Sequence, residues 1–408
     1  MKLRHAAPVV LAVLASAGAT ARSDWRLDIT PLPSPAAAPS GQPQLRTSGR
    51  GVLMSWIERT GATATLKFAE RTAGGWSEPR VVASGDDWFI NWADVPSVVR
   101  LDSGTLAAHW LQKSGPGTYA YDVRLSFSTD EGRTWSPSLT PHSDGTRTEH
   151  GFASLYDVPG GGLGLIWLDG RSMTGDHAGH GAGEMSLRSA TFGADLTQTS
   201  ETLVDGRVCE CCPTTAAVTS DGVIVAYRDR SEEEIRDIYV SRLENGRWTK
   251  GAPVHADNWR IPACPVNGPS LSARGRDVAI AWFTLRNQQG QAFAAFSRDA
   301  GRTFGSPIRL DDGGTQGRVD IELLPDGSAV ASYIEMGGDR PSFHVRRVEP
   351  SGARSAAMAV AGIEGTRTSG YPRMALHEGE LTFAWIERDS ELRVKTAHAR
   401  LPGAPASK

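Results

Sequence analysis

The chain has 408 residues and a formal net charge of −3, from 43 basic and 46 acidic side chains. This near balance offers no basic surface to a phosphate backbone, so we expect no nucleic-acid partner. Hydrophobic residues make up 39% of the chain and charged residues 22%, a composition typical of a globular protein with a substantial core.

The N-terminus has the pattern of an export signal. Lys2 and Arg4 precede an apolar run over residues 6–15, and small residues follow at 19–21. This order is typical of a signal peptide, and the run is too short to cross a bilayer as a helix. We therefore predict a signal peptide over residues 1–21, a periplasmic or extracellular protein, and no membrane span.

An aromatic residue closes a short apolar run seven times, at intervals of 51 to 60 residues. The repeats consist of short β-rich runs separated by turn residues, and a period of this size is typical of a β-propeller. We predict an all-β fold, a β-propeller of seven four-stranded antiparallel blades over residues 44–401, with six blades as the alternative. The seven aromatic residues are Trp56, Trp110, Trp167, Tyr227, Trp282, Tyr333 and Trp385.

The last repeat ends with the chain and lacks an outer strand. Residues 22–43 contain a segment of strand character, Trp25–Pro31, followed by a Pro-rich linker. We predict that this segment completes the last blade, which would close the ring and leave no open edge. Residues 402–408 are expected to form a disordered tail.

Two segments share the pattern Ser-x-Asp-x-Gly-x-Thr-aromatic, namely Ser128–Trp135 and Ser297–Phe304. The Asp can cap its own turn, and the Gly can adopt positive φ. The pattern resembles the Asp-box of the sialidase superfamily, whose members are β-propellers. The resemblance covers most of residues 25–400 and implies the fold. It implies less about activity, because Asp-boxes lie on the propeller rim and occur in propellers of other function.

The first strand of each propeller blade faces the axis, so the residues that enter it are candidates for a site at the channel mouth. A ring of polar side chains stands at these positions and predicts a binding site there. In chain order the candidates are Arg46, Asp94, His150, Cys211 with Cys212, Asn267, Arg318, and Tyr371 with Arg373. Three loop tryptophans, expected to be exposed, could stack on sugar rings: Trp88, Trp92 and Trp259.

Sialidases hold a carboxylate with three arginines and use a Tyr nucleophile with an Asp acid. Here the resemblance implies a clamp of Arg46, Arg318 and Arg373, with Asp94 as the acid and Tyr371 as the nucleophile. His150 and Asn267 are further substrate-binding candidates. The expected function is an exported, glycan-directed propeller that hydrolyses glycosidic bonds of acidic sugars. The alternatives are a non-catalytic propeller that binds carbohydrate or protein, and a copper-linked periplasmic protein.

The four cysteines, Cys209, Cys211, Cys212 and Cys264, precede the first strands of two adjacent repeats. In an exported protein the first interpretation is a disulfide, for which three pairings exist. The second is a thiolate metal site, because soft sulfur ligands suit copper(I) or zinc. No cofactor is required for the fold, and copper is possible.

Two further features are less specific. The Gly-rich loop over residues 173–185 offers Met173, His177, His180 and Met185 as weak copper ligands, and a solvent loop or a lid is the alternative. A charge cluster, Arg228–Arg230 with Arg236 and Asp237, predicts an ion-pair network that braces a hairpin.

Overall fold

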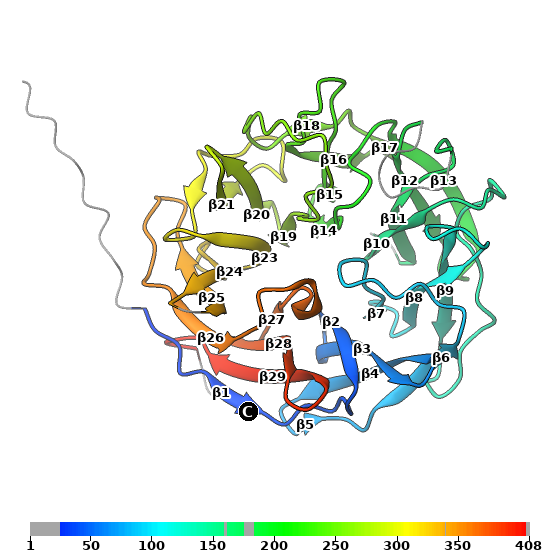
Figure 1. Cartoon of the computed structure of the whole chain (residues 1–408), viewed down its shortest axis with the longest axis horizontal. Coiled ribbons are helices and arrows are strands. Elements are labelled where there is room, and N and C mark those ends of the chain that lie inside the picture. Colours follow the sequence, from blue (N-terminus) through cyan, green and yellow to red (C-terminus); the bar gives the residue numbers. More distant parts are fainter. Residues whose placement is uncertain (1–24, 159–160, 175–182, 339, 405–408) are drawn as a thin grey trace, which may run out of the picture.

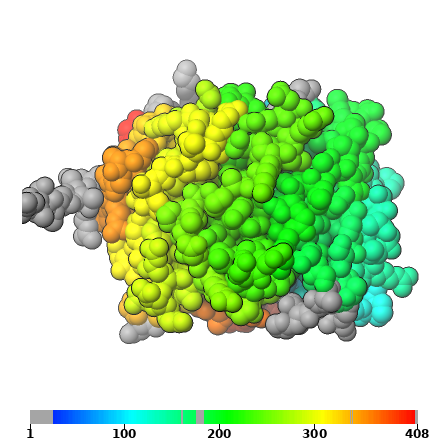
Figure 2. All heavy atoms as spheres, turned by 90° about the horizontal axis from the view of Figure 1, so that it is seen from above, coloured from blue at the N-terminus to red at the C-terminus, as the bar shows by residue number. Residues whose placement is uncertain are grey.

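The computed structural model describes residues 25–158, 161–174, 183–338 and 340–404, which form seven sheets around a central axis (Figure 1). The predicted seven-bladed propeller is confirmed, and the six-bladed alternative is excluded. Edge-on, the blades follow one another round the molecule in chain order (Figure 2). Among these residues no helix is both long and apolar enough to cross a membrane.

Each blade is an antiparallel meander that runs outward from the axis. The innermost strands are β2 (Ser40–Ser48), β7 (Ser97–Arg100), β10 (His150–Asp157), β14 (Thr215–Thr219), β19 (Ser270–Arg274), β23 (Thr315–Leu323) and β27 (Arg373–His377). The second strands are β3 (Gly51–Thr60), β8 (Leu106–Lys113), β11 (Leu163–Asp169), β15 (Gly222–Arg228), β20 (Asp277–Arg286), β24 (Ala329–Gly337) and β28 (Glu380–Arg388).

The outer half of each blade is less regular. The third strands are β4 (Thr63–Thr72), β9 (Tyr121–Ser128), β12 (Ser186–Phe192), β16 (Ile238–Glu244), β21 (Gln289–Ser297), β25 (Arg340–Val348) and β29 (Leu392–Arg400). The strands outside them are β1 (Thr30–Leu32), β5 (Gly75–Trp76), β6 (Arg80–Gly85), β13 (Gln198–Asp205), β17 (Arg247–Trp248), β18 (Ala252–Pro253), β22 (Ile308–Arg309) and β26 (Met358–Gly362). Blade 2 has only three strands, and a Leu125–Leu139 bridge replaces the fourth.

The ring closes between the two ends of the described chain. Strand β1 pairs with β29, with Thr30 opposite His398 and Leu32 opposite Thr396. Ahead of β1, Trp25, Leu27 and Ile29 pack on the apolar cluster shared by blades 6 and 7. The N-terminal segment therefore supplies the outer strand of the last blade as predicted, although the strand itself is only Thr30–Leu32.

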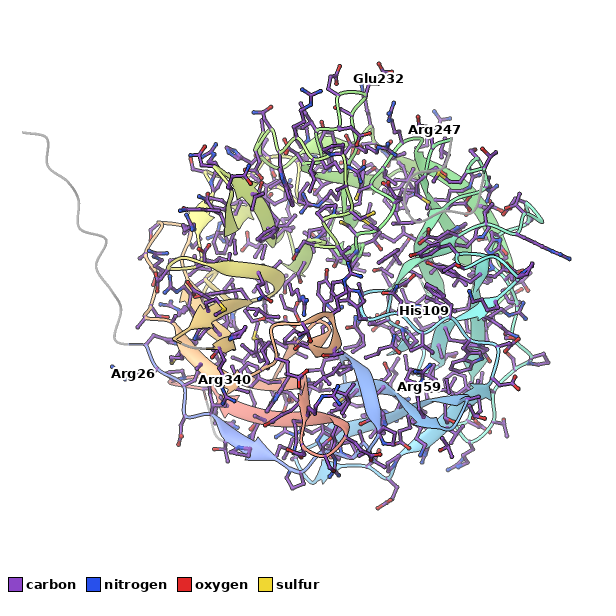
Figure 3. All side chains as sticks on the ribbon, in the orientation of Figure 1. Arg26, Arg59, His109, Glu232, Arg247 and Arg340 are labelled. Carbon is purple, nitrogen blue, oxygen red and sulfur yellow. The ribbon has the colours of Figure 1, made fainter. Side chains whose placement is uncertain are left out.

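The seven repeated aromatic residues all lie on second strands, and none is more than 7% exposed. Four of them also bond a carboxylate: Trp56 Nε1 donates to Glu58, Trp167 Nε1 to Asp169, Trp282 Nε1 to Asp257 and Tyr227 Oη to Asp205. Side chains of this kind fill the spaces between neighbouring sheets, whereas Glu232 and Arg247 lie at the outer rim (Figure 3). The period of the sequence thus reflects one buried aromatic per blade.

The two repeated turns fold alike. Ser128 and Thr134 hydroxyls donate to the two carboxylate oxygens of Asp130 at 2.8 and 2.7 Å. The same two bonds, both 2.7 Å, form around Asp299 in blade 5. The backbone and hydroxyl donors of Thr134 hold the pKa of Asp130 at about 2. The side chain therefore caps its turn as a carboxylate.

Removal of the N-terminal strand should destabilise the ring. A chain that begins at Pro33 loses the β1 ladder and the packing of Trp25, Leu27 and Ile29, at about 1 kcal/mol for each partly buried side chain. It also exposes the edge of β29. We expect a lower Tm and faster aggregation, measured by thermal unfolding with light scattering. A chain that begins at Asp24 keeps β1 and serves as the control. Equal Tm values would contradict the closing role.

Candidate functional site

The starts of the seven innermost strands surround one cavity on the axis, called here the axial cavity. Each blade contributes neighbouring residues, among them Arg46, Asp94, Ser154, Asp320 and Arg373. Of the predicted entry residues, Arg46, Asp94, Tyr371 and Arg373 line this cavity. The cavity volume is ≈ 80 Å³, below the roughly 300–1,000 Å³ of small-molecule sites. In this conformation the cavity accommodates a group the size of a carboxylate rather than a sugar ring.

Two arginines from neighbouring blades line the axial cavity. Arg46 lies on β2 and Arg373 on β27, and the Nε atom of each is buried without a hydrogen-bond partner. Neither side chain forms an ion pair with any described residue. Burial lowers the pKa of both, and the charge of Arg373 lowers the pKa of Arg46 further. Two cations that lack a direct partner make this part of the cavity attractive to an anion.

Three carboxyl groups share the cavity with these arginines. Asp320 accepts hydrogen bonds from the Ser270 hydroxyl (2.7 Å) and from the Met374 amide (2.9 Å). Burial, and then repulsion by Asp320, raises the pKa of Glu322 to about 8. Burial raises the pKa of Asp94 to about 7. Near neutral pH, Glu322 is therefore mostly protonated and Asp94 about half protonated, so the arginine charges are only partly balanced.

Behind Asp94 lies a buried polar group that sequence reasoning missed. The Tyr121 hydroxyl lies 2.8 Å from Glu149 Oε1 and 3.2 Å from Asp94 Oδ2. Burial raises the pKa of Glu149 to about 8. One phenolic proton cannot serve two carboxylates at once, so this group retains a further proton near neutral pH. No local motif marks Tyr121 or Glu149, because the contact joins the start of β9 to the loop before β10.

Tyr371 lines the cavity, but its hydroxyl is already bonded. It donates to the Val266 carbonyl at 2.7 Å, and burial raises its pKa above the ordinary value. Its ring stacks on Trp92 at 6.0 Å and 18°. On the other side the Arg373 guanidinium lies 5.2 Å from the ring centroid. A carbonyl cannot take the phenolic proton, so no base for Tyr371 is in place.

Arg318 and Asn267 do not line the axial cavity. The Arg318 guanidinium donates to the Thr366 and Gly370 carbonyls at 3.0 and 2.8 Å and lies 4.7 Å from the Trp92 ring. Asn267 Oδ1 accepts a bond of 2.8 Å from the Arg318 amide. These contacts link the loop before β19 to β23 and to residues 366–370, next to the cavity. Of the three arginines of the predicted clamp, Arg46 and Arg373 share the cavity, whereas Arg318 is committed to backbone carbonyls.

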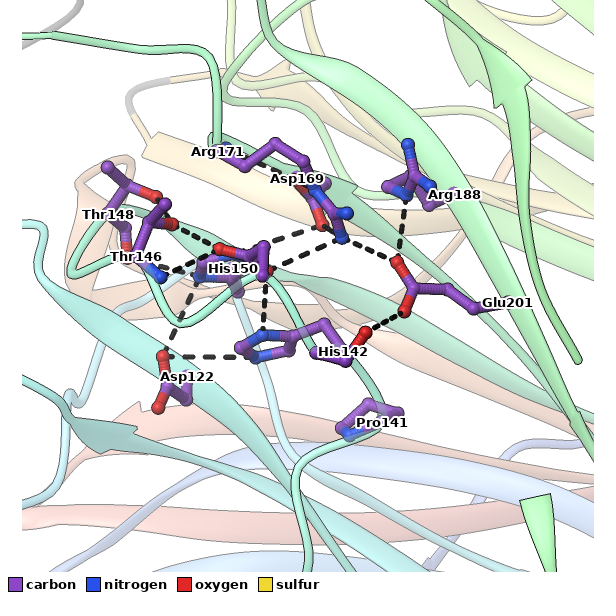
Figure 4. A network of polar contacts seen from close by, with 12 residues as sticks. Asp122, Pro141, His142, Thr146, Thr148, His150, Asp169, Arg171, Arg188 and Glu201 are labelled. Atoms are coloured by element: carbon purple, nitrogen blue, oxygen red, sulfur yellow. Dashed lines mark hydrogen bonds and ion pairs between the residues drawn. The ribbon is translucent and has the colours of Figure 1, made fainter.

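His150 is fully buried between blades 2 and 3, in a network of polar contacts (Figure 4), and it does not line the axial cavity. Its ring stacks on His142 at 3.8 Å, and its Nε2 lies 3.2 Å from Asp144 and 3.8 Å from Asp169. Burial opposes a charge on His150, but the bond to Asp144 and the nearby carboxylates raise its pKa overall.

Ligand-type atoms in this His150 group lie within 4.8 Å of one another in two sets of three. However, Arg171 already bridges Asp169 at 2.7 Å and Glu201 at 2.6 Å. The raised pKa of His150 favours its positively charged form. The geometry is therefore that of a buried ion-pair network between blades.

The expected disulfide is not formed. All four cysteines are free, and Cys209 Sγ lies 3.7 Å from Cys211 Sγ and 3.5 Å from Cys212 Sγ. A disulfide requires about 2.05 Å. These cysteines lie beside the axial cavity, because Cys212 immediately precedes Pro213, which lines the cavity.

The remaining candidate residues, the weak copper ligands and the loop tryptophans, have contacts typical of a structural role where they are described. Met173 and Met185 are buried in an apolar cluster, and His177 and His180 lie outside the described residues. Trp88 is partly buried and stacks on Trp110 at 5.5 Å. The expectation that Trp259 is exposed is wrong. It is only 6% exposed, because it packs on Phe283 and under the Arg228 guanidinium.

The charge cluster of blade 4 braces its loops, as predicted, but Arg228 is an exception. Arg236 pairs with Glu210 at 2.8 Å and with Glu234 at 2.9 Å, and Arg230 pairs with Glu234 at 2.6 Å. Arg228 instead donates only to backbone carbonyls. Its buried charge therefore lacks a carboxylate partner within the described part of the chain.

No family model matches the chain, and no curated protein matches it. Among solved structures, a protein of unknown function from Dyadobacter fermentans is 14% identical, with a TM-score of 0.51 over 89% of this chain and 94% of that one. The polysaccharide lyase Uly1 is 12% identical, with 0.52 over 90% and 91%. An α-L-arabinanase of Penicillium chrysogenum is 12% identical, with 0.50 over 78% and 96%. The chain thus has the β-propeller fold that its resemblance to the sialidase superfamily implies.

The raised pKa of Asp94 should make stability depend on pH. Its carboxyl titrates at about 7 in the folded protein, against 3.8 for a free group. The folded state therefore binds more protons between these values, and its stability falls as the pH rises through them, by at most about 1.4 kcal/mol per pH unit. We expect Asp94→Asn to flatten this dependence in denaturant unfolding between about pH 5 and pH 8.

Asp86→Asn, at an exposed position, is the matched control and should follow the wild-type curve. Parallel curves for wild type and Asp94→Asn would contradict a raised pKa at Asp94.

Proposed function

We propose that the protein binds an acidic glycan at the axial cavity, with the sugar carboxylate held between Arg46 and Arg373. The observation that carries this is the pair of guanidinium groups that line the cavity, each with a buried Nε atom that lacks a hydrogen-bond partner and neither with an ion-pair partner among the described residues. Guanidinium groups match carboxylate geometry through parallel hydrogen bonds. The glycan class is supported by the fold shared with a polysaccharide lyase and an arabinanase. Export, predicted from residues 1–21, would bring the protein to glycans outside the cytoplasm.

The same cavity supplies a general acid for glycosidic hydrolysis. Asp94 has a pKa of about 7 and one carboxylate oxygen that is buried without a partner. A carboxylic acid that keeps its proton near neutral pH can protonate the oxygen of a leaving sugar. For Tyr371 to act as the nucleophile, its hydroxyl must leave the Val266 carbonyl. Non-catalytic binding is the alternative, and it requires the arginines alone.

Entry of a sugar requires part of the wall to move. Trp92 packs between the Arg318 guanidinium and the Tyr371 ring, and it belongs to the loop before β7. Opposite this loop, the segment that contains η1 (Arg367–Ser369) reaches toward the centre of the ring (Figure 1). Because the present cavity is ≈ 80 Å³, we propose that these two segments separate when a glycan binds.

Neutralising either cavity arginine should weaken binding of a uronic or sialic acid. Loss of one charged hydrogen-bond pair costs about 1.5–3 kcal/mol, which corresponds to a roughly 10- to 100-fold higher Kd. We expect this for Arg46→Met and Arg373→Met in calorimetric titrations with acidic oligosaccharides. Arg298→Gln, on a 58% exposed rim arginine, is the control. The proposal fails if neutral and acidic sugars bind equally, or if the rim variant loses as much affinity.

Turnover should separate catalysis from binding. If the protein is a hydrolase, fluorogenic sialosides or uronides are cleaved and Asp94→Asn lowers kcat by about 100-fold or more. Tyr371→Phe should abolish turnover only if Tyr371 is the nucleophile. Tight binding of acidic sugars with no turnover of any glycoside would instead establish a binding propeller.

A further inference from the structure

A second site lies beside the axial cavity, where the loops that enter β14 and β19 meet. The sulfurs of Cys209, Cys211 and Cys212 lie within 4.8 Å of one another, at 3.5 and 3.7 Å for the two closest pairs. Cys264, from the second loop, interacts with the Cys211 thiol. The three sulfurs that lie within 4.8 Å of one another, together with the neighbouring Cys264, are called here the thiol cluster.

The sulfur separations suit a shared ion. Around a tetrahedral centre with metal–sulfur bonds of about 2.3 Å, sulfurs lie about 3.8 Å apart. The distances of 3.5 and 3.7 Å are close to this value. Two of the sulfurs belong to buried residues, Cys209 and Cys212, while Cys264 is exposed and leaves a path from solvent.

Two buried arginines lie close to the thiol cluster, and Arg228 has no carboxylate partner among the described residues, whereas Arg236 pairs with Glu210 and Glu234. Arg228 is 1% exposed, donates only to backbone carbonyls and interacts electrostatically with Cys212. Arg236 is 2% exposed, and its Nη1 lies 3.3 Å from Cys209 Sγ. A buried cation without a counter-charge is strongly unfavourable. Thiolate sulfurs would supply the missing negative charge.

A backbone donor also points at the cluster. The Asn267 amide donates to Cys212 Sγ at 3.4 Å. Donors of this kind around a sulfur ligand orient it and spread its negative charge. The unpaired Arg228 and this amide are separate observations, and both favour negative charge on the Cys212 sulfur.

We propose that Cys209, Cys211 and Cys212 bind a thiophilic closed-shell cation, copper(I) or zinc, with Cys264 as the fourth ligand. Soft thiolates select these ions over magnesium or calcium. Each coordinating thiol gives up its proton on binding, so the site gains negative charge close to Arg228, which has no carboxylate partner among the described residues. The ion would tie the loop before β14 to the loop before β19.

Metal analysis of the purified full-length chain tests the proposal. We expect about one equivalent of copper or zinc per chain, and thiols that react with a thiol reagent only after a chelator is added. Titration of the stripped protein with copper(I) and with zinc, against chromophoric chelators, shows which ion is preferred. We expect Cys212→Ser to lower the affinity at least 10-fold and Cys264→Ser to lower it less.

His142→Ala is the matched control, because it removes a ligand-type side chain from the other cluster of such residues. It should leave copper and zinc binding unchanged. The wild-type chelator experiment needs no variant, so it decides the matter even if Cys212→Ser does not fold. Two outcomes overturn the proposal. One is a mass lower by two or four hydrogens, which indicates disulfides. The other is four reactive thiols that bind neither ion.

Discussion

The site depends on the convergence of seven innermost strands on one axis. A strand that starts there brings its first side chains close to those of the neighbouring blades, with no apolar layer between them. Arg46 and Arg373 are neighbours for this reason, although their charges repel and burial lowers the pKa of both. Asp320 and Glu322 attract Arg46 from a distance without forming an ion pair with it. The ring geometry thus holds two like charges, from two different blades, close to the same axis.

The carboxyl groups respond to the same constraint. Burial raises the pKa of Asp94 to about 7 and of Glu322 to about 8, so both lose much of their charge at neutral pH. Protonated neighbours do not neutralise the arginines, and the cavity stays positive. As the pH rises through this range the carboxylates form, and the cavity becomes less attractive to an anion. The pH range in which Asp94 keeps its proton is therefore also the range in which the cavity attracts an anion most strongly.

The sequence predicted the fold because every blade spans the same radius and buries one aromatic on its second strand, which keeps the period near constant. It could not predict which entry side chains reach the axis. Arg318 has φ of 51° within an irregular stretch of β23, and Phe152 has φ of 50° at a register shift in β10. One extra residue in a strand reverses the faces of those that follow. Arg318 lies within such an irregular stretch, and neither it nor His150 lines the cavity, whereas Arg46 and Arg373 do. The contact of Asp94 with Tyr121 crosses 27 residues and has no local signal.

The thiol cluster and the axial cavity share a wall. Cys212 is followed by Pro213, and a Cβ added at Gly268 would lie 2.1 Å from the Pro213 carbonyl, so the two loops pack with no free space. In the second loop, the Val266 carbonyl accepts the Tyr371 hydroxyl, and Asn267 bonds both Cys212 and Arg318. A displacement of the Cys212 sulfur would therefore be transmitted toward Arg318 through the backbone amide and side-chain oxygen of Asn267. An ion held by the four sulfurs would fix the same wall on which the Trp92 stack rests. The proposed metal site and the proposed glycan site would then be mechanically coupled, although they share no ligand.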